Sequence, residues 1–392
     1  MKILFINGLH PKPNNKMSGI FITNRLKYLK NFSKIEYYSI SPIMKDSISL
    51  KFLRKIMNRP LNIIYPSKIT VENVEFNFIN INTNIFTRIF YNFPRMAAKS
   101  ILKIINIKEY DLIHAHWIYP HGYIAKIISE KYKIPYIVTA HGSDIHFFPQ
   151  KDFNVKKFTI ETLENSTKNI FVSTSLLEKA KKFGFSGKNS VVIPNGVDLS
   201  KFKILNREKI KKEIGLDEKV VGFAGGLSFV KRADKLPEIF NIINSKLKKI
   251  SFLLIGEGKY KEKIINETKN LDVKIMGYIN PEKMPYYLNA MDIMILPSRN
   301  EGFGAVLIEA MACGTYVIGS SNGGIPEVIK SYGSIINEGG NFEKRIADEV
   351  VRVLKEGYDR EVLKNYAKNY DWNLIIEKEV KIYKEILGDK KC

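Results

Sequence analysis

The sequence has little cysteine and no long run of apolar residues. Only Cys313 and Cys392 occur among its 392 residues, which excludes a disulfide framework and favours a reducing compartment. Nowhere do about 18 consecutive apolar residues occur, so the sequence predicts no transmembrane helix. The apolar run at residues 2–7 is too short for a signal peptide and is typical of a first strand. We therefore expect a cytoplasmic protein.

Acidic residues are scarce relative to basic ones. The 62 lysines and arginines against 40 aspartates and glutamates give a formal net charge of +22. Most of the excess lies in residues 1–195, which contain 29 basic and 12 acidic residues, a net charge of +17. Such a surplus indicates an anionic partner. The hydrophobic content of 45% is that of an ordinary globular protein, which argues against disorder.

The chain is longer than a single hydrophobic core usually supports, so we expect two domains. Short β-branched runs alternate with stretches of helical period, which predicts parallel sheets covered by helices. The alternation restarts near residue 219, after the turn-rich sequence at 194–198. We place one domain at 1–196 and another at 197–371, with an amphipathic helix at 372–392 packing back on the first. The expected strands are 2–7, 34–39, 111–115, 135–140, 169–173, 190–193, 219–224, 251–255, 272–276, 292–296 and 316–319.

The segment from Leu296 to Gly314 carries the clearest chemical signal. Gly302 and Gly304 let the backbone approach a ligand closely, and free N–H groups near Ala305 would form a phosphate site at a helix start. Glu309 is the only charged residue of the apolar helix that follows, so its carboxylate needs donors such as ribose hydroxyls. The alternative is that Glu301 is a surface residue and Glu309 pairs with a nearby lysine or arginine.

The frame Glu-Gly-Phe-Gly at 301–304, followed by Glu-Ala-Met-Ala-Cys-Gly-Thr from Glu309, resembles the donor-binding signature of family-4 retaining glycosyltransferases, the glycosyl transferases group 1. The resemblance implies that Glu301 lies against the donor sugar, that Glu309 holds the ribose, and that Phe303 belongs to the donor site. Similar segments occur in order over nearly the whole chain, at 111–117, 139–144, 191–198, 254–258 and 319–327. The implied architecture is α/β, the GT-B fold of two Rossmann-like doubly wound domains facing across a cleft.

A second similar segment, 223–232, corresponds to the family's Gly-Arg-Leu sequence that ends in Lys-Gly, with two departures. Gly226 stands where the family has arginine, and Arg232 where it has glycine. Lys231 still supplies a cation for the negative charge that develops on the leaving diphosphate. Arg232 either substitutes for the missing arginine or is a solvated surface residue. We include Gly226, Lys231 and Arg232 in the donor site.

Five of the six histidines lie between positions 114 and 146. His141 follows a predicted strand, at the sheet edge where such folds bind ligands. A lone histidine there is more often structural, but the resemblance implies that His141 contacts the donor sugar and makes it a catalytic candidate with Glu301 and Lys231. We assign Gly19, His116 and Asp144 to the acceptor side of the cleft. A zinc site in this histidine cluster is the alternative; because the motifs already explain the cluster, we expect no metal.

Two stretches of the first half, 49–59 and 88–103, interleave cations with large apolar residues, as interfacial helices do. They predict docking on an anionic membrane, at the inner face of the cell membrane. The alternative is that each forms an amphipathic helix packed on its own sheet with its lysines outward.

The sequence therefore predicts a retaining, metal-independent hexosyltransferase without a cofactor. Its substrates would be a UDP- or GDP-sugar and a lipid-linked or surface polysaccharide or glycolipid acceptor. By resemblance, the mechanism is front-face attack assisted by the leaving diphosphate. Alternatives are a sugar-nucleotide epimerase or glycan phosphorylase of the same fold, a basic nucleic-acid-binding protein, for which no binding module is recognisable, and a catalytically silent partner subunit.

Overall fold

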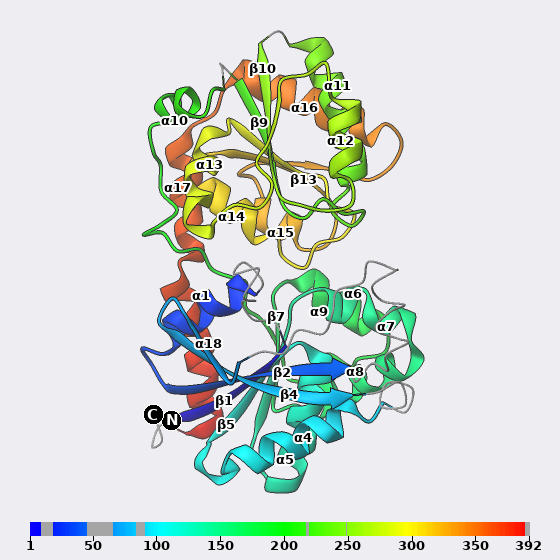
Figure 1. Cartoon of the computed structure of the whole chain (residues 1–392), viewed down its shortest axis with the longest axis vertical. Helices are drawn as coiled ribbons and strands as arrows, with labels where there is room; N and C mark the ends of the chain where they lie inside the picture. The colour runs from blue at the N-terminus through cyan, green and yellow to red at the C-terminus, as the bar shows by residue number, and fades with distance from the viewer. Residues whose placement is uncertain (9–18, 45–65, 84–90, 217–218, 248, 389–392) are drawn as a thin grey trace. The chain divides into compact units, whose positions relative to one another are not determined.

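A computed structural model describes residues 1–8, 19–44, 66–83, 91–216, 219–247 and 249–388 (Figure 1). The chain forms two compact units. The first contains Met1–Val172, Leu176–Ile193 and Ile376–Cys392, and the second contains Ser173–Ser175 and Pro194–Ile375. The chain thus leaves the first unit after Ile193 and returns to it at Ile376.

The first unit contains an eight-stranded sheet in the order β3-β4-β2-β1-β5-β6-β7-β8, parallel except for the β3–β4 pair. The central strands β1, β5 and β6 are almost entirely buried, and β1 and β6 are accordingly mostly apolar, whereas β5 carries His114 and His116 among its apolar residues. The strand bounds are β1 (Lys2–Asn7), β2 (Lys34–Met44), β3 (Lys68–Val71), β4 (Val74–Thr83), β5 (Leu112–His116), β6 (Tyr136–Ala140), β7 (Lys168–Phe171) and β8 (Ser190–Val192).

Helices between these strands cover the first sheet, and the last helix of the chain, α18 (Trp372–Leu387), joins this unit from Ile376 onward. The other helices and helical turns are α1 (Ile20–Leu29), α4 (Phe93–Ile104), η1 (Ile107–Glu109), η2 (Ile118–Gly122), α5 (Tyr123–Tyr132), α6 (Ser143–His146), α7 (Phe148–Lys151), α8 (Phe153–Asn165) and α9 (Thr174–Lys182).

The second unit contains a six-stranded, all-parallel sheet in the order β11-β10-β9-β12-β13-β14. Numbered along the chain this is 3-2-1-4-5-6, the order of a Rossmann domain. The strands are β9 (Lys219–Ala224), β10 (Ile250–Ile255), β11 (Val273–Ile275), β12 (Ile293–Leu296), β13 (Tyr316–Ser320) and β14 (Ser334–Ile336).

The helices of the second unit form two packed groups, one containing α11, α12 and α16 and the other α10, α13, α14 and α17, which lie on opposite sides of the sheet (Figure 1). Their bounds are α10 (Arg207–Glu213), η3 (Ala233–Lys235), α11 (Leu236–Lys246), α12 (Lys261–Glu267), η4 (Pro281–Lys283), α13 (Met284–Ala290), α14 (Ala305–Ala312), α15 (Ile325–Ile329), α16 (Phe342–Glu356), α17 (Arg360–Ala367) and η5 (Lys368–Tyr370). Helices on both faces make the sheet doubly wound.

The strand order reverses beside the first strand of each unit, and ligands of such folds bind outside the carboxyl ends of the strands at that point. In the second unit the reversal lies between β9 and β12, so the loops after Ala224 and Leu296 meet there. In the first unit it lies between β1 and β5, which end at Asn7 and His116. Each unit therefore offers a ligand site of its own.

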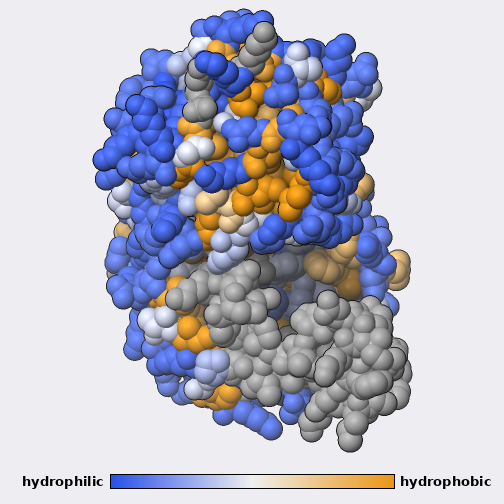
Figure 2. All heavy atoms as spheres, turned by 45° about the horizontal axis from the view of Figure 1, so that its top comes forward, coloured by the Kyte–Doolittle hydropathy of each residue, from blue (hydrophilic) through white to orange (hydrophobic). Residues whose placement is uncertain are grey.

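Hydrophilic residues cover most of the described surface on the face drawn in Figure 2, where hydrophobic residues gather in separate groups. Within the described ranges, no helix is both long and apolar enough to cross a bilayer.

Candidate active site

The loop between β12 and α14 forms the centre of the site in the second unit. Gly304, the N-cap of α14, has φ 90° and ψ 46°, a left-handed conformation that favours glycine. No side chain caps α14, and its first turn contains no acidic residue. The N–H groups from Ala305 onward therefore point toward a position that suits an anion.

A neighbouring pair of glycines fixes this loop. A Cβ atom at Gly323 would lie 2.0 Å from the carbonyl oxygen of Glu301, and one at Gly324 would lie 2.6 Å from that of Gly302. The Gly324 N–H also donates to the Glu301 carbonyl oxygen at 3.1 Å. Only glycines allow the two loops to pack backbone against backbone here, which holds Glu301 and Gly302 in place.

Lys231 and Glu301 form an ion pair at this loop, with side-chain exposures of 27% and 14%. Arg299 holds the segment that carries Lys231: its guanidinium donates to Asp234 at 2.6 and 2.9 Å, and its backbone N–H donates to the Val230 carbonyl oxygen at 2.8 Å. The bidentate contact aligns the two segments. The sequence did not predict this contact, because Arg299 and Asp234 share no motif and are far apart in the chain.

The carboxylate of Glu309 is half-buried on α14, and burial raises its pKa to about 7. In the described part of the chain no group donates a hydrogen bond to this carboxylate or forms an ion pair with it. The described residues therefore do not support the alternative in which Glu309 pairs with a lysine or arginine. A desolvated carboxylate without donors is a site for ligand hydroxyl groups.

The loop after β9 lies at the same sheet edge. A Cβ atom at Gly256 would lie 1.9 Å from the Gly225 carbonyl oxygen, and one at Gly258 would lie 2.3 Å from that of Leu227, so these two loops also pack closely. Gly226 differs, because a Cβ atom built there meets nothing within 4 Å. The position where the resemblance leads us to expect arginine is open space.

Arg232 is 5% exposed, so the interpretation as a solvated surface arginine is wrong. Its Nη2 atom donates to Glu338 at 2.5 Å, and its guanidinium lies 3.8 Å from the centre of the Phe342 ring. These contacts anchor the segment that bears Lys231. A direct donor contact by Arg232 stays a prediction.

In the first unit, Asp144 organises the loop that follows β6. Its carboxylate accepts hydrogen bonds from the backbone N–H groups of His141 (3.1 Å), Gly142 (2.8 Å) and Ile118 (3.3 Å). Asp144 is 2% exposed, and burial raises its pKa to about 6 although the backbone hydrogen bonds lower it. The carboxylate thus positions His141 rather than facing solvent.

His141 is the outer member of a row of three imidazoles. Its Nε2 atom lies 2.9 Å from Nδ1 of His116, whose ring stacks on that of His114 with centroids 4.5 Å apart. Burial is the main reason that the pKa of each of the three lies well below the usual histidine value, so all three are neutral at pH 7.

A buried polar network from α18 and α1 supports this row. The His114 Nδ1 atom lies 2.7 Å from the hydroxyl of Tyr383, which in turn donates to Glu379. The Glu379 carboxylate forms a fully buried ion pair with Arg25 at 2.6 Å. The sequence identified the amphipathic tail but not these polar residues on it.

Gly19 begins α1 with φ 69°, which only glycine adopts readily, and places the chain so that the Phe21 ring lies 4.8 Å from the His141 ring. Gly19, His116 and Asp144 therefore all support the surroundings of His141. Among the described residues, no three histidine, cysteine, aspartate or glutamate side chains are grouped so that they could hold a metal ion.

Two family profiles match the chain. The profile described as "Glycosyl transferases group 1" matches residues 206–370, and that described as "Glycosyltransferase Family 4" matches residues 72–201. The first match contains every donor-site residue named above, and the second contains His116, His141 and Asp144.

Curated relatives cover most of the chain. An uncharacterized glycosyltransferase of Methanocaldococcus jannaschii is 30% identical over 316 residues, 73% of this chain and 79% of the relative. The N-acetyl-alpha-D-glucosaminyl L-malate synthase of Bacillus anthracis is 28% identical over 352 residues, 84% of this chain and 87% of the relative.

Solved structures share the fold over nearly the whole chain. The sucrose-phosphate synthase of Thermosynechococcus elongatus superposes with a TM-score of 0.78 at 17% identity, covering 99% of this chain and 100% of that one. HepE of Anabaena, solved with UDP-glucose, gives a TM-score of 0.68 at 17% identity, covering 98% of this chain and 100% of that one. The predicted GT-B fold with two Rossmann-like domains is thereby confirmed, and the chain belongs to the family-4 glycosyltransferases, the glycosyl transferases group 1.

Proposed function

We propose that this glycosyltransferase moves a hexose from a nucleotide-diphosphate-sugar to its acceptor with retention of configuration and without a metal or other cofactor. The observation that carries the donor assignment is the Glu309 carboxylate, which is desolvated yet receives no hydrogen bond from the described residues. The two hydroxyl groups of a ribose supply the donors that it lacks.

The second unit supplies the groups that a diphosphate needs. The uncapped start of α14, with Gly302, Phe303, Gly304 and Ala305, offers backbone N–H groups to the phosphates. Lys231 offers a cation, and its ion pair with Glu301 sets the ammonium against the loop that would hold the sugar. This arrangement stabilises the charge that grows on the leaving group.

We propose front-face transfer. The bond between the anomeric carbon and the diphosphate oxygen breaks, and a bond from that carbon to the acceptor oxygen forms on the same face. The acceptor proton passes to the departing diphosphate, so no side chain becomes a covalent nucleophile. His141 of the first unit is the side chain that we place next to the transferred sugar.

For the acceptor we propose a lipid-linked or surface glycan precursor. A Bacillus subtilis relative, 28% identical over 340 residues, has a name that assigns it provisionally to teichuronic acid biosynthesis. The Anabaena structure with UDP-glucose favours a UDP-sugar over a GDP-sugar as the donor.

We further propose reversible docking of the first unit on the inner face of an anionic membrane. The stretch 49–59 and residues 88–90 lie outside the described residues. In α4, Pro94, Ala97 and Ile101 are buried, whereas Arg95, Lys99 and Lys103 are exposed at a spacing of four residues, so this helix packs on its own unit with its basic residues outward, as the alternative expected. The outward basic residues of α4 are the groups that we propose to face the membrane. Each basic residue near an anionic surface contributes about 1 kcal/mol.

The test of the donor assignment is thermal stabilisation by a panel of UDP- and GDP-sugars, because a ligand that binds only the folded state raises Tm. One nucleotide series should stabilise the wild type, and Glu309→Ala should lose most of that shift. The product of the best donor, examined by NMR, should keep the anomeric configuration. Inversion would rule out the retaining mechanism, and equal shifts in both proteins would remove Glu309 from the donor site.

A further inference from the structure

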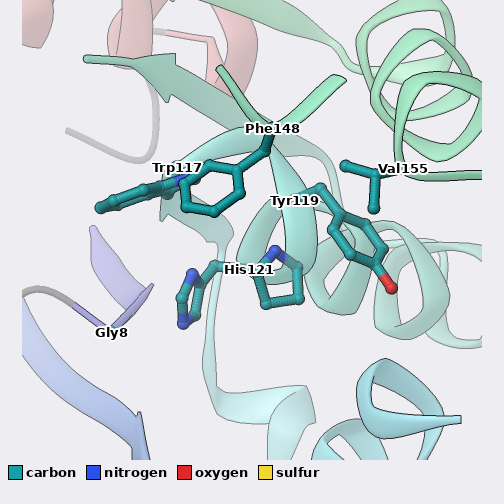
Figure 3. Close-up of a pocket in the computed structure, with 7 residues that line it drawn as sticks. Gly8, Trp117, Tyr119, His121, Phe148 and Val155 are labelled. Carbon is teal, nitrogen blue, oxygen red and sulfur yellow. The ribbon is translucent and has the colours of Figure 1, made fainter. Parts of the chain in front are cut away.

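The first unit contains a pocket of about 410 Å³ at the carboxyl ends of β1 and β5, lined in part by Gly8 and His121 (Figure 3). Its volume lies in the range of small-molecule sites. The side chains that line it are mainly aromatic or aliphatic and come from η2 and the residue before it, from α7 and from α8: Trp117, Tyr119, Pro120, Phe148 and Val155.

The aromatic walls of the pocket are packed in place. The rings of Trp117 and Phe148 lie 5.9 Å apart, and the Tyr119 ring stacks on Phe158 at 5.6 Å. Trp117 has φ 80°, an unusual value for tryptophan, and its backbone N–H donates to the Thr139 carbonyl oxygen at 2.9 Å. The backbone of Trp117 is thus held in a conformation that tryptophan rarely adopts. The indole wall of the pocket is therefore preformed.

The described residues of the lining do not have the chemistry of a sugar site. Polar sugars need charged or amide side chains that converge on their hydroxyls, and among the described lining residues the side chains with polar atoms are those of Trp117, Tyr119 and His121. The Tyr119 hydroxyl points away from Trp117 and Phe148 (Figure 3). The surface that remains for a ligand is apolar, which suits a hydrocarbon chain.

The rim of the pocket combines exposed phenylalanines with a lysine. Phe147 and Phe148 are each 43% exposed, and Phe153, two residues before Val155, is 80% exposed. Lys151 lies over the Phe147 ring at 4.0 Å.

Lys151, three residues after Phe148 on α7, is the cation that these contacts place at the rim. The acidic residue of this segment, Asp152, is occupied by the Tyr91 hydroxyl at 2.6 Å and by backbone N–H groups at the start of α8. The rim is therefore apolar and cationic together, which complements an anionic head group on a hydrocarbon chain.

We propose that the pocket binds the hydrocarbon chain of an anionic amphiphile, whose head group lies beside Lys151. One chain enters between Trp117, Phe148 and Val155, while the charged head stays at the surface. The identification of this amphiphile with the acceptor rests on the proposed function; the binding of the chain itself does not.

The test uses monomeric n-alkyl phosphates of increasing chain length, with inorganic phosphate as the reference. Each added methylene that enters the pocket should lower Kd about fourfold, until the pocket is full and the gain stops. The chain contains only two tryptophans, and Trp372 is 1% exposed, so quenching by a chain-brominated phosphate reports on Trp117. Affinity independent of chain length, or equal to that of inorganic phosphate, would overturn the proposal.

Matched variants locate the site. Val155→Asp should abolish the dependence on chain length, whereas Val362→Asp, the same change at a 48% exposed valine of α17, should preserve it. Lys151→Glu should weaken alkyl phosphates at least threefold but leave neutral alkyl glycols unchanged, and Lys108→Glu, in η1 before β5, should change neither.

UDP-sugar binding is measured on every variant. It separates this proposal from the donor assignment, because chain-length dependence can be lost while UDP-sugar binding persists, and UDP-sugar binding can be lost while chain-length dependence persists. An unchanged circular dichroism spectrum shows that Val155→Asp is folded. Equal chain-length dependence in Val155→Asp and the wild type would place the hydrocarbon elsewhere and refute the pocket.

Discussion

The Nδ1 atom of His116 lies 2.9 Å from the Nε2 atom of His141, and both imidazoles are buried and neutral. Two neutral imidazoles in such contact share a single proton. If His116 donates it, the other nitrogen of His141, Nδ1, carries a hydrogen; if His141 donates it, that Nδ1 is a bare acceptor. The tautomers of His116 and His141 are therefore linked, and we expect His116 to act as a positioning residue for His141.

His116→Phe should lower kcat about tenfold with little change in donor affinity. Phenylalanine preserves the ring contacts with Phe5 and His114 but removes the hydrogen bond to His141, and a net hydrogen bond is worth about 0.5–1.5 kcal/mol. His116→Gln, which can still bond to His141, should recover part of the loss. Steady-state kinetics and donor titration of both variants check this. A loss confined to KM, or equal loss in both variants, would contradict the positioning role.

The buried histidines also predict how stability depends on pH. Their folded-state pKa values are lowered, so the unfolded chain binds more protons below its own histidine pKa of about 6.5, and stability falls as the pH drops through that value. Each of the three histidines should lower the free energy of unfolding by about 1 kcal/mol between pH 6.5 and 5.5.

The measurement is urea unfolding of the wild type and His116→Gln at the two pH values. Asp144 and Glu309 have raised pKa values and work in the opposite direction, but they are present in both proteins. The variant should therefore lose about 1 kcal/mol less than the wild type over this interval. Identical losses would show that His116 titrates normally in the folded protein.

Donor binding should depend on the ionisation of Glu309. Its pKa of about 7 means that the carboxylate is charged above pH 7 and protonated below it. Because the charged form accepts hydrogen bonds from ribose better, the affinity should fall as the pH drops below 7, by at most about tenfold per pH unit.

Calorimetry with a UDP-sugar, whose diphosphate does not titrate in this range, measures the effect between pH 5.5 and 8. Glu309→Gln should bind more weakly at pH 8, by about 1.5–3 kcal/mol, and its affinity should be flat with pH. A wild-type affinity that is flat over the same range would show that Glu309 does not meet the donor.

Strands buried on both faces were predictable from sequence, whereas the edge of the first sheet was not. The expected ranges for β1 and β9 agree with the structure, because central parallel strands are continuous apolar runs. The β3–β4 hairpin was missed: asparagines interrupt the apolar pattern of β4, and its turn at Glu72 and Asn73 relies on positive φ values of 47° and 61°. The short edge strand β14 was missed as well.

The residues of the candidate site also fall into those that the sequence predicted and those that only the fold reveals. Glu301, Glu309 and Lys231 stand in local motifs that the sequence displays directly. The groups that hold them do not, because partners such as Arg25 and Glu379 are 354 positions apart and only the fold brings them together. The aromatic pocket likewise draws on η2, α7 and α8, with no periodic signal.

Lys231→Ala should slow turnover more than it weakens donor binding. Negative charge grows on the diphosphate in the transition state, and removing one such stabilising group costs about 10²–10³ in kcat. Because Lys231 and Glu301 are ion-paired, the losses of Lys231→Ala and Glu301→Ala should not add in the double variant. Lys246→Ala, which breaks an exposed ion pair with Asp348, is the control and should leave kcat unchanged. If kcat holds and only donor Kd rises, Lys231 is a binding residue alone.

The open position at Gly226 offers a gain of function. A side chain there would meet no atom within 4 Å of its Cβ, and the residue does not have a positive φ, so arginine fits without strain. The position lies at the carboxyl end of β9, beside the loop that carries Lys231, where a guanidinium could contact a diphosphate bidentately. Gly226→Arg should tighten UDP-sugar binding about tenfold, for about 1.4 kcal/mol.

Gly340→Arg is the matched control, because its Cβ also meets nothing within 4 Å and it too lacks a positive φ. It adds the same charge to the same unit and should leave the affinity for the UDP-sugar unchanged.

Arg232→Ala tests whether Arg232 substitutes for the arginine that is missing at position 226 or only anchors its own segment. If Arg232 only anchors its segment through Glu338 and Phe342, the variant should lose Tm while Gly226→Arg still improves binding in its background. A wild-type Tm together with a lost donor affinity would instead make Arg232 the substitute, and Gly226→Arg would then restore the affinity that Arg232→Ala removes.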